Sequence, residues 1–493
     1  MTDAAAPVPD LAGIPASIPA TDPLAPYDAV LLLSYGGPRR PEDVLPFMRN
    51  ATAGRGVPDS RLLEVSGHYQ GFGGASPINA RNAELRDALQ ARLAERGSTL
   101  PVVVGNRNWH PFVSQALREL ADTGARHVLA LPTAAFGSYS GCRQYREDLA
   151  GAAALLAAGA DGSTGDGFEA DAAARVGGEG GAPVDLTVDK TRPYYNTPGL
   201  LEANVDAIVE AYGALAEQGV AAADVRLVLV THSIPLGMEA GSAPTPESDG
   251  ASEPAAAGQP AGRPAGPREP GVAADLSTEV SYVAQHRALA AILVPEVARR
   301  LGLEEVASDL VYCSRSGPPQ ARWLEPDVND HLEALAAGQL TNGSPADRPG
   351  GVVVAPFGFI SDHMEVVFDL DTEAAQTARD LGMPYARAAT VGTHPAFVDS
   401  LVDILIERAA VARGEDVHPA STTGVGPFHT VCPPSCCRSG AHHPGQHSHH
   451  GADGAAHESA ARHQPAAGGS CRPVSAEPES LKPASCGRMK EKR

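Results

Sequence analysis

Short, continuously apolar segments recur along this chain and most constrain its fold. They lie at the start of residues 27–38, 100–111, 127–140, 225–235, 309–317 and 350–363. A strand with no polar face is buried on both sides, which is typical of a parallel sheet covered by helices. Segments of helical pattern lie between these runs, at residues 77–97, 112–126, 199–219 and 281–302. The alternation predicts an α/β fold.

The alternation is interrupted once, so we expect two Rossmann-like, doubly wound domains with parallel sheets. The interruption is rich in Gly, Ala and acidic residues, and such segments bury too little apolar surface to offset their chain entropy. The predicted parts are a disordered leader (1–26), a first domain (27–158), a low-complexity insert (159–185), a second domain (186–412) with its own insert (241–272), a cysteine segment (413–440) and a disordered tail rich in His and Cys (441–493).

The net charge of −21 argues against a nucleic-acid partner and against adhesion to an anionic membrane. No apolar run reaches the ~18–20 residues of a membrane span. The N-terminus lacks the basic and long apolar regions of a secretory signal. We therefore expect a cytoplasmic protein without a membrane span.

Two of the predicted strands end in residues that can carry chemistry. His232 ends the run at residues 225–235, and Glu365, Asp369 and Glu373 follow the run at 350–363 with a spacing of four. On a helix this spacing gives an acidic column, which a local π-helical turn would align better. Ligands bind at the carboxyl ends of parallel strands, and a His with a carboxylate suits Fe²⁺, Zn²⁺, Ni²⁺ or Co²⁺ better than Mg²⁺. The residues alone leave open a solvated acidic face and a hydrogen-bonded core histidine.

Five segments in order resemble the ferrochelatases, which insert ferrous iron into a porphyrin. They are LLLSYGGP (31–38), GHYQGFGGASPIN (67–79), VTHSIP (230–235), SRSGPPQARWLEPD (314–327) and FGFISDHMEVVFDLD (357–371). The resemblance spans residues 27–437 apart from the inserts. It implies the class II chelatase fold with a porphyrin cleft, and a lyase of haem biosynthesis. His232 matches the family's active-site histidine and Glu365 its partner carboxylate, both toward Fe²⁺, and Asp369 with Glu373 continues its acidic ladder.

The resemblance is closest to actinobacterial members that use coproporphyrin III, because Tyr35 matches their tyrosine on the proximal face of the iron. It implies a coproporphyrin III ferrochelatase that forms Fe-coproporphyrin III and releases two protons. Contacts to the porphyrin are expected from Tyr35, Ser76, Tyr145, Tyr69 and Arg55. The chain departs from related sequences at three positions where they carry basic residues, namely Thr52, Ala53 and His68. This puts the propionate clamp in doubt, and the candidate substitutes are Arg49, Arg55 and backbone N–H groups.

Further expectations are a monomer and a transient handover of the product to a coproheme decarboxylase. The alternatives are a protoporphyrin IX ferrochelatase, a chelatase for another metal or ring, and a non-enzymatic haem-binding protein of two domains.

Five of the seven cysteines lie after residue 430. Cys432, Cys436 and Cys437 need a fourth ligand for an iron–sulfur cluster, and Cys142 is the candidate. The resemblance implies a [2Fe–2S] cluster on these four residues. Spacing alone leaves zinc open, and adjacent cysteines both ligate only if they bind different irons or if the backbone bends. Cys313 lies within an apolar strand and is predicted to be a buried thiol.

Overall fold

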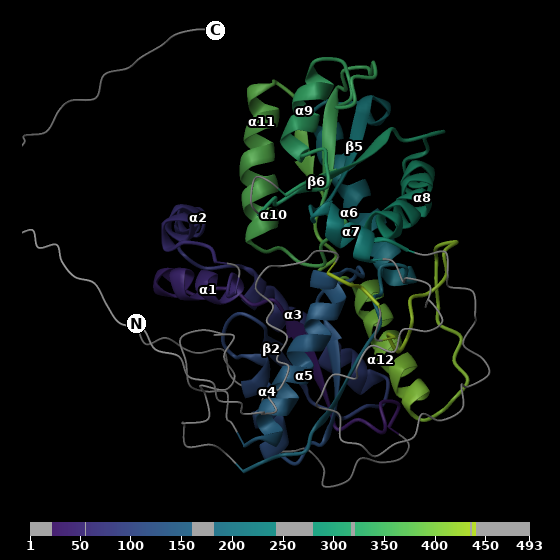
Figure 1. Cartoon of the computed structure of the whole chain (residues 1–493). Helices are drawn as coiled ribbons and strands as arrows, with labels where there is room; N and C mark the ends of the chain where they lie inside the picture. The colour runs from purple at the N-terminus through teal and green to yellow at the C-terminus, as the bar shows by residue number, and fades with distance from the viewer. Residues whose placement is uncertain are drawn as a thin grey trace, which may run out of the picture. The chain divides into compact units, whose positions relative to one another are not determined.

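The computed structural model describes residues 22–54, 56–159, 182–242, 280–316, 321–433 and 436–439. These residues include two four-stranded parallel sheets (Figure 1). The first has the order β2-β1-β3-β4, with β1 (Ala29–Ser34), β2 (Val102–Asn106), β3 (His127–Pro132) and β4 (Thr187–Lys190). The second has the order β6-β5-β7-β8, with β5 (Val225–His232), β6 (Ser308–Cys313), β7 (Gly351–Ala355) and β8 (Tyr385–Arg387). The predicted α/β fold with parallel sheets is confirmed.

Strand β1 shows why the apolar runs lack a polar face. All six of its residues are buried. Val30 and Leu32 belong to one core, whereas Leu31 and Leu33 belong to another on the opposite face of the sheet. Helix α3 (Ile78–Glu95) covers the first face, and α4 (Val113–Asp122) with α5 (Gln144–Ala157) covers the second. A strand between two helical layers has no side available for polar residues.

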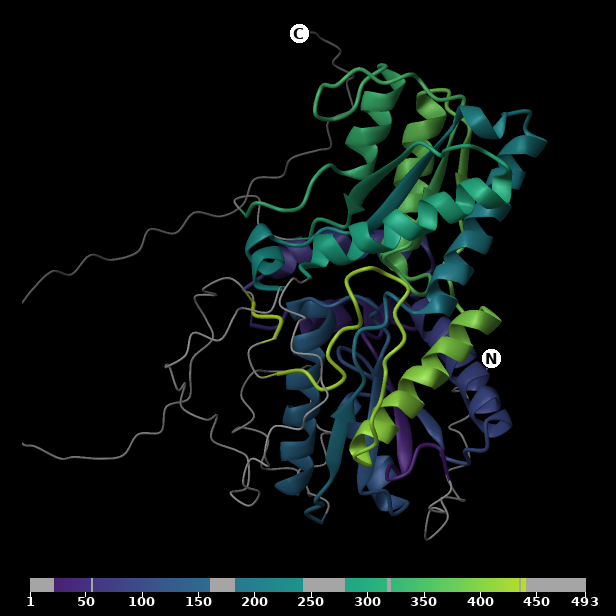
Figure 2. The same ribbon diagram turned by 90° about the vertical axis from the view of Figure 1, so that its right-hand side faces the viewer.

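One hydrophobic core joins the two sheets. It contains Leu227 and Leu229 of β5 together with residues of β1 and of three long helices, α6 (Pro198–Glu217), α8 (Tyr282–Leu301) and α12 (Pro395–Ala412). Although α12 follows the second sheet in sequence, it packs against α3 and α6 (Figure 2). The opposite face of the second sheet is covered by α9 (Val328–Ala336), α10 (Met364–Phe368) and α11 (Ala375–Asp380).

Other described elements lie outside these layers. They are the 3₁₀ turns Pro41–Asp43 and Ala222–Asp224, helices α1 (Val44–Ala51), α2 (Asp59–Gly71) and α7 (Leu236–Ser242), and the π-helical turns Tyr139–Arg143 and Asp369–Ala374. None of the described helices has the length and apolar character needed to cross a membrane.

Two of the expected boundaries differ from the structure. The leader was expected to extend to residue 26, but Leu24 is fully buried in the core that joins the two sheets, called the joint core below. Arg413 also donates to the carbonyl of Ala25. Strand β4 lies within the range expected for the second domain, yet it pairs with β3 of the first sheet. Its four residues are exposed or half-buried, so they form no apolar run that sequence patterns detect. The other domain bounds stay a prediction, and the two inserts and the tail lie almost wholly outside the described residues.

The shared strand order places a reversal point in each sheet. The order runs outward in both directions from β1 in the first sheet and from β5 in the second. Ligands of open parallel sheets bind at such reversals, beyond the carboxyl ends of the strands. Tyr35 directly follows β1, and His232 is the last residue of β5. The fold therefore gives these two residues equivalent positions in the two sheets.

Candidate functional site

His232 and Glu365 form an ion-pair contact at the carboxyl end of the second sheet. His232 Nε2 lies 3.3 Å from Glu365 Oε1. Strand β5 positions the histidine, and the first turn of α10, which follows neighbouring strand β7, positions the glutamate. Burial lowers the pKa of His232, but the Glu365 carboxylate outweighs burial and raises it overall. The two predicted site residues are thus brought together.

The backbone fixes which nitrogen of His232 faces Glu365. Its Nδ1 lies 2.5 Å from the carbonyl oxygen of Ser233. A carbonyl only accepts, so Nδ1 carries a hydrogen and donates it. In the neutral ring, Nε2 then has a free lone pair directed toward the carboxylate side of the site. The imidazole is arranged to take up a proton or to bind a metal ion through Nε2.

A second histidine contacts the same glutamate. His363 Nδ1 accepts from the backbone N–H of Val366, and its Nε2 lies 3.4 Å from Glu365 Oε2. Burial lowers the pKa of His363, so the ring is neutral and Nε2 is its donor. Burial of Glu365 by itself raises the pKa of its carboxyl, but attraction to His232 and His363 outweighs this and lowers the pKa to about 2. Glu365 is therefore ionised over the physiological range.

The next carboxylate in the acidic column behaves differently. Burial raises the pKa of Asp369 to about 7, and the nearby charges of Glu365 and Glu373 add to this. The Ser314 hydroxyl donates to Asp369 Oδ2 and opposes the rise. Burial also raises the pKa of Glu373. The π-helical turn begins at Asp369, as the spacing of the three carboxylates suggested. The column thus contains one carboxylate that ionises fully and one that exchanges a proton near neutral pH.

The first sheet contributes aromatic residues. The Tyr35 side chain is 40% exposed and packs edge-to-face on Phe47, which in turn packs on Tyr69 of α2. Burial raises the pKa of the Tyr69 hydroxyl, and Tyr35, Glu365 and Asp369 contribute to this shift. Tyr69 is therefore electrostatically linked both to Tyr35 and to the carboxylates of α10.

Arg107 lies between two of the predicted porphyrin contacts. Its guanidinium carbon is 5.9 Å from the ring centre of Tyr35 and 4.6 Å from that of Tyr145. Buried Arg107 pairs with half-buried Asp148, and Tyr145 is only 5% exposed within the core of the first sheet. Sequence reasoning did not select Arg107. The signal was available, because Arg107 follows β2 at the same sheet edge.

The other predicted porphyrin contacts are placed in several ways. Ser76 is buried, and its backbone N–H donates to the carbonyl of Pro38. Arg49 pairs with Asp59 at 2.6 Å, so an anionic ligand there competes with a carboxylate. Arg55 lies outside the described residues. His68, where a basic residue was expected, stacks on Phe368 of α10 at a ring distance of 3.9 Å. This contact, between α2 and α10 of Figure 1, joins the two halves beside the acidic column.

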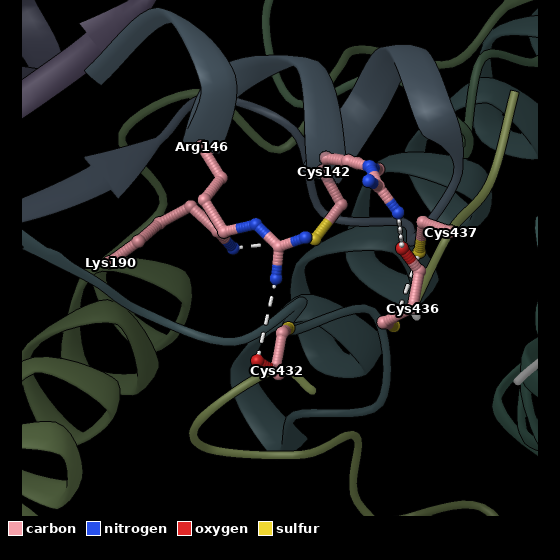
Figure 3. Close-up of a pocket in the computed structure, with 7 residues that line it drawn as sticks. Cys142, Arg146, Lys190, Cys432, Cys436 and Cys437 are labelled. Atoms are coloured by element: carbon pink, nitrogen blue, oxygen red, sulfur yellow. Dashed lines mark hydrogen bonds between the residues drawn. The ribbon is translucent and has the colours of Figure 1, made fainter. Parts of the chain in front are cut away.

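Four cysteines from two distant parts of the sequence lie close together in space (Figure 3). Cys142 lies in the π-helical turn Tyr139–Arg143, and Cys432, Cys436 and Cys437 lie after α12. Cys436 Sγ and Cys437 Sγ are 3.5 Å apart, and Cys142 interacts with the thiols of Cys432 and Cys437. Cys437 has a φ of 53°, in the left-handed region. The bent backbone that adjacent ligands require is present.

Cationic groups surround these thiols. Lys190 Nζ lies 3.3 Å from Cys142 Sγ, and Arg143 and Arg146 donate to the carbonyls of Cys436 and Cys432. Hydrogen bonds from the thiols of Cys432 and Cys437 lower the pKa of Cys142, and Lys190 adds to this effect. Thiolates are the form that binds iron or zinc, so the charge environment fits a thiolate-bound group.

The described residues contain no group of three or more His, Cys, Asp or Glu side chains arranged to hold a metal ion. A [2Fe–2S] cluster makes a different demand, because its two irons divide the four thiolates between them. Four thiols with nearby cations suit such a cluster, and they also suit the Cys₄ sites that hold zinc. Cys313 is 1% exposed, which confirms its prediction as a buried thiol.

The family model described as ferrochelatase matches residues 27–163 and 159–409. A coproporphyrin III ferrochelatase of Streptomyces coelicolor is 42% identical over 85% of this chain and 96% of its own length. Proteins with the same description from Streptomyces griseus and Mycolicibacterium smegmatis are 43% and 39% identical, over 84% and 83% of this chain and 94% and 99% of theirs.

Among solved structures, a sirohydrochlorin chelatase of Bacillus subtilis subspecies spizizenii in complex with cobalt is similar over 78% of this chain and 97% of its own. Its TM-score of 0.37 at 11% identity is too low to carry an argument.

Proposed function

The chain belongs to the ferrochelatase family, and from this membership we propose that it is an enzyme that inserts Fe²⁺ into coproporphyrin III. The products are Fe-coproporphyrin III and two protons. The observation that carries the proposal is the contact between His232 and Glu365 at the end of β5, beside a carboxylate that titrates near neutrality. The choice of coproporphyrin III rests on the relatives that carry this description and on Tyr35.

Metallation removes two pyrrole protons while the iron sheds water. We assign proton uptake to His232, whose Nε2 lone pair is free in the neutral ring, and charge stabilisation to ionised Glu365. Asp369, with a pKa of about 7, passes protons onward along the column toward Glu373. A porphyrin supplies four nitrogen ligands itself, so the protein needs few ligands of its own to deliver the ion. Tyr35 is proposed to approach the iron from the opposite face, since tyrosinate is a known ligand of haem iron.

The test is anaerobic metallation with Fe²⁺ and either coproporphyrin III or protoporphyrin IX, followed through the Soret band. We expect turnover with coproporphyrin III, its loss in His232→Ala, and wild-type turnover in the matched control His418→Ala. Unfolding curves check that both variants fold. Failure of the wild type with either porphyrin contradicts the enzymatic proposal, and a preference for protoporphyrin IX contradicts the choice of substrate.

We further propose that Cys142, Cys432, Cys436 and Cys437 hold a [2Fe–2S] cluster. Support comes from the four neighbouring thiols, the bend at Cys437 and the surrounding cations. The purified protein is expected to be brown, and Cys142→Ser to lose the visible absorbance. A matched Cys313→Ser variant is expected to keep it. A colourless wild type that contains zinc contradicts the cluster. The cytoplasmic location, the monomeric state and the handover to a decarboxylase stay predictions.

A further inference from the structure

We propose that Tyr282, at the N-terminal end of α8, is a positioning residue that fixes the backbone and the ring of His232. Its catalytic consequence rests on the proposed function, whereas its structural consequence can be measured without any turnover. Tyr282 does not touch the reacting atoms. It acts from behind β5, on the side that faces the joint core.

The contact is a hydrogen bond to the main chain of His232. Tyr282 Oη donates to the carbonyl oxygen of His232 at 3.1 Å. On the other side of the same peptide, the N–H of Ser233 donates to the carbonyl of Cys313 at 2.8 Å. The peptide between His232 and Ser233 is therefore held at both its polar ends. The acceptor for His232 Nδ1 is the carbonyl of Ser233, which belongs to the next peptide, so the held peptide anchors the segment that carries this acceptor.

The Tyr282 hydroxyl must act as a hydrogen-bond donor, because the protons of the neighbouring His286 and Thr231 are used in other hydrogen bonds. His286 Nδ1 lies 2.7 Å from the carbonyl of Tyr282, so it donates, and its Nε2 accepts from the Thr231 hydroxyl at 2.8 Å. Burial lowers the pKa of His286 to about 3, so Nε2 has its lone pair at neutral pH. Thr231 thus has no proton left for Tyr282. The Tyr282 hydroxyl is left as the donor, shared between Thr231 Oγ1 at 2.7 Å and the carbonyl of His232.

The start of α8 is itself firmly held. The backbone N–H of Tyr282 donates to Ser242 Oγ at 2.8 Å. Gln285, which is fully buried, accepts from the N–H of Gly137 and donates to its carbonyl. His286 stacks on Phe136 with ring centres 3.7 Å apart. Because the first turn of α8 is fixed, the Tyr282 hydroxyl can hold the carbonyl of His232 in place.

The Thr231 side chain is tightly packed and has little space in which to move. Gly358 lies just after β7, and a Cβ on it would lie 2.2 Å from Thr231 Oγ1. The backbone at Gly358 therefore packs directly against the Thr231 side chain. Three polar side chains are buried together here, Thr231, Tyr282 and His286. Burying polar groups costs stability unless each is hydrogen-bonded, and an apolar trio of this size would pack without that demand. The polar set lies directly behind His232, where its hydrogen bonds have a positioning effect that an apolar set lacks.

The experiment compares Tyr282→Phe with a matched control, Tyr212→Phe. Tyr212 is also a buried tyrosine of the joint core, but its hydroxyl has no hydrogen-bond partner among the described residues. The ring ¹⁵N and ¹³C NMR signals of His232, assigned with His232→Ala and recorded at a pH where the ring is neutral, report which nitrogen carries the hydrogen. Steady-state metallation gives kcat and KM, and thermal unfolding defines a temperature at which every variant is folded.

We expect the wild type and Tyr212→Phe to show the Nδ1–H form of His232. Tyr282→Phe is expected to show a mixture of Nδ1–H and Nε2–H forms, a loss in kcat of about tenfold or more, and a KM for the porphyrin within about twofold of wild type. His286→Leu, which leaves the Tyr282 hydroxyl in place, is expected to have a smaller effect on both readouts. An unchanged Nδ1–H signal in Tyr282→Phe overturns the inference whatever happens to turnover. If the wild type metallates no porphyrin, the proposed function fails, but the NMR comparison still decides the role of Tyr282.

Discussion

Glu365→Gln tests the electrostatic core of the site. The amide has nearly the size of the carboxylate but carries no charge. In the wild type, burial lowers the pKa of His232 and the Glu365 carboxylate raises it above the ordinary value. Without the carboxylate, only the hydrogen bond to Ser233 and the more distant Asp369 oppose burial, so the pKa of His232 is expected to fall below its ordinary 6.5.

The size of this fall follows from the geometry. Charges 3.3 Å apart interact by about 1 kcal/mol in water and by about 5 kcal/mol at an effective dielectric constant of ~20. The two side chains are 28% and 41% exposed, so solvent screens the pair and the lower half of this range applies. The loss of the pair is therefore expected to remove about 2 kcal/mol of interaction energy. Because proton transfer depends on this pair, turnover is expected to fall by about 10²–10⁴-fold.

The assay is NMR titration of the His232 ring together with the Soret assay for metallation. Glu333→Gln, at an exposed position on α9, removes one negative charge elsewhere and serves as the control. A His232 pKa that stays above the ordinary value in Glu365→Gln refutes the electrostatic reasoning. Turnover within tenfold of wild type refutes the assignment of the pair to the chemistry.

Two further perturbations test the column and the core. In wild type, Asp369 binds a proton more tightly when folded, with a pKa of about 7 against 3.8, so this residue makes stability fall as pH rises from about 4 to 7. Asp369→Asn is expected to lose that dependence. Its free energy of unfolding, measured with urea, should gain up to about 4 kcal/mol relative to wild type between pH 4 and pH 8. Parallel pH profiles of the two proteins would contradict this. Gly199→Ala is expected to destabilise the protein by about 1–3 kcal/mol or more, because the added Cβ would lie 1.7 Å from the carbonyl oxygen of Ala396 on α12. Gly213→Ala, on the same helix but with open space around it, is the control and is expected to be neutral or slightly stabilising.

The parts of the site that sequence patterns predict share one physical origin. His232 and Glu365 come from positions next to strand ends, and the ends of parallel strands meet at one edge whatever the details of packing. The three carboxylates lie on one local element, which includes the π-helical turn Asp369–Ala374, so their spacing alone indicates a shared face. Tyr282 and His286 could not be found in this way. They lie on a helix, and which of its faces points to β5 depends on contacts with Gly137 and Ser242, distant in the sequence. Helix α12 shows the same limit, since it follows the second sheet but packs on α3 and α6.

The equal strand order of the two sheets bears on how the site is divided. The residue after β1 is a tyrosine, and the last residue of β5 is a histidine, although both stand at the reversal point of their sheet. The phenol is backed by Phe47 and the cationic Arg107, whereas the imidazole is backed by Glu365. A planar ring held between the two would therefore meet a phenol oxygen on one face and an imidazole with carboxylates on the other. The two sides of the candidate site are therefore chemically distinct, which is why we assign proton uptake to the side of His232.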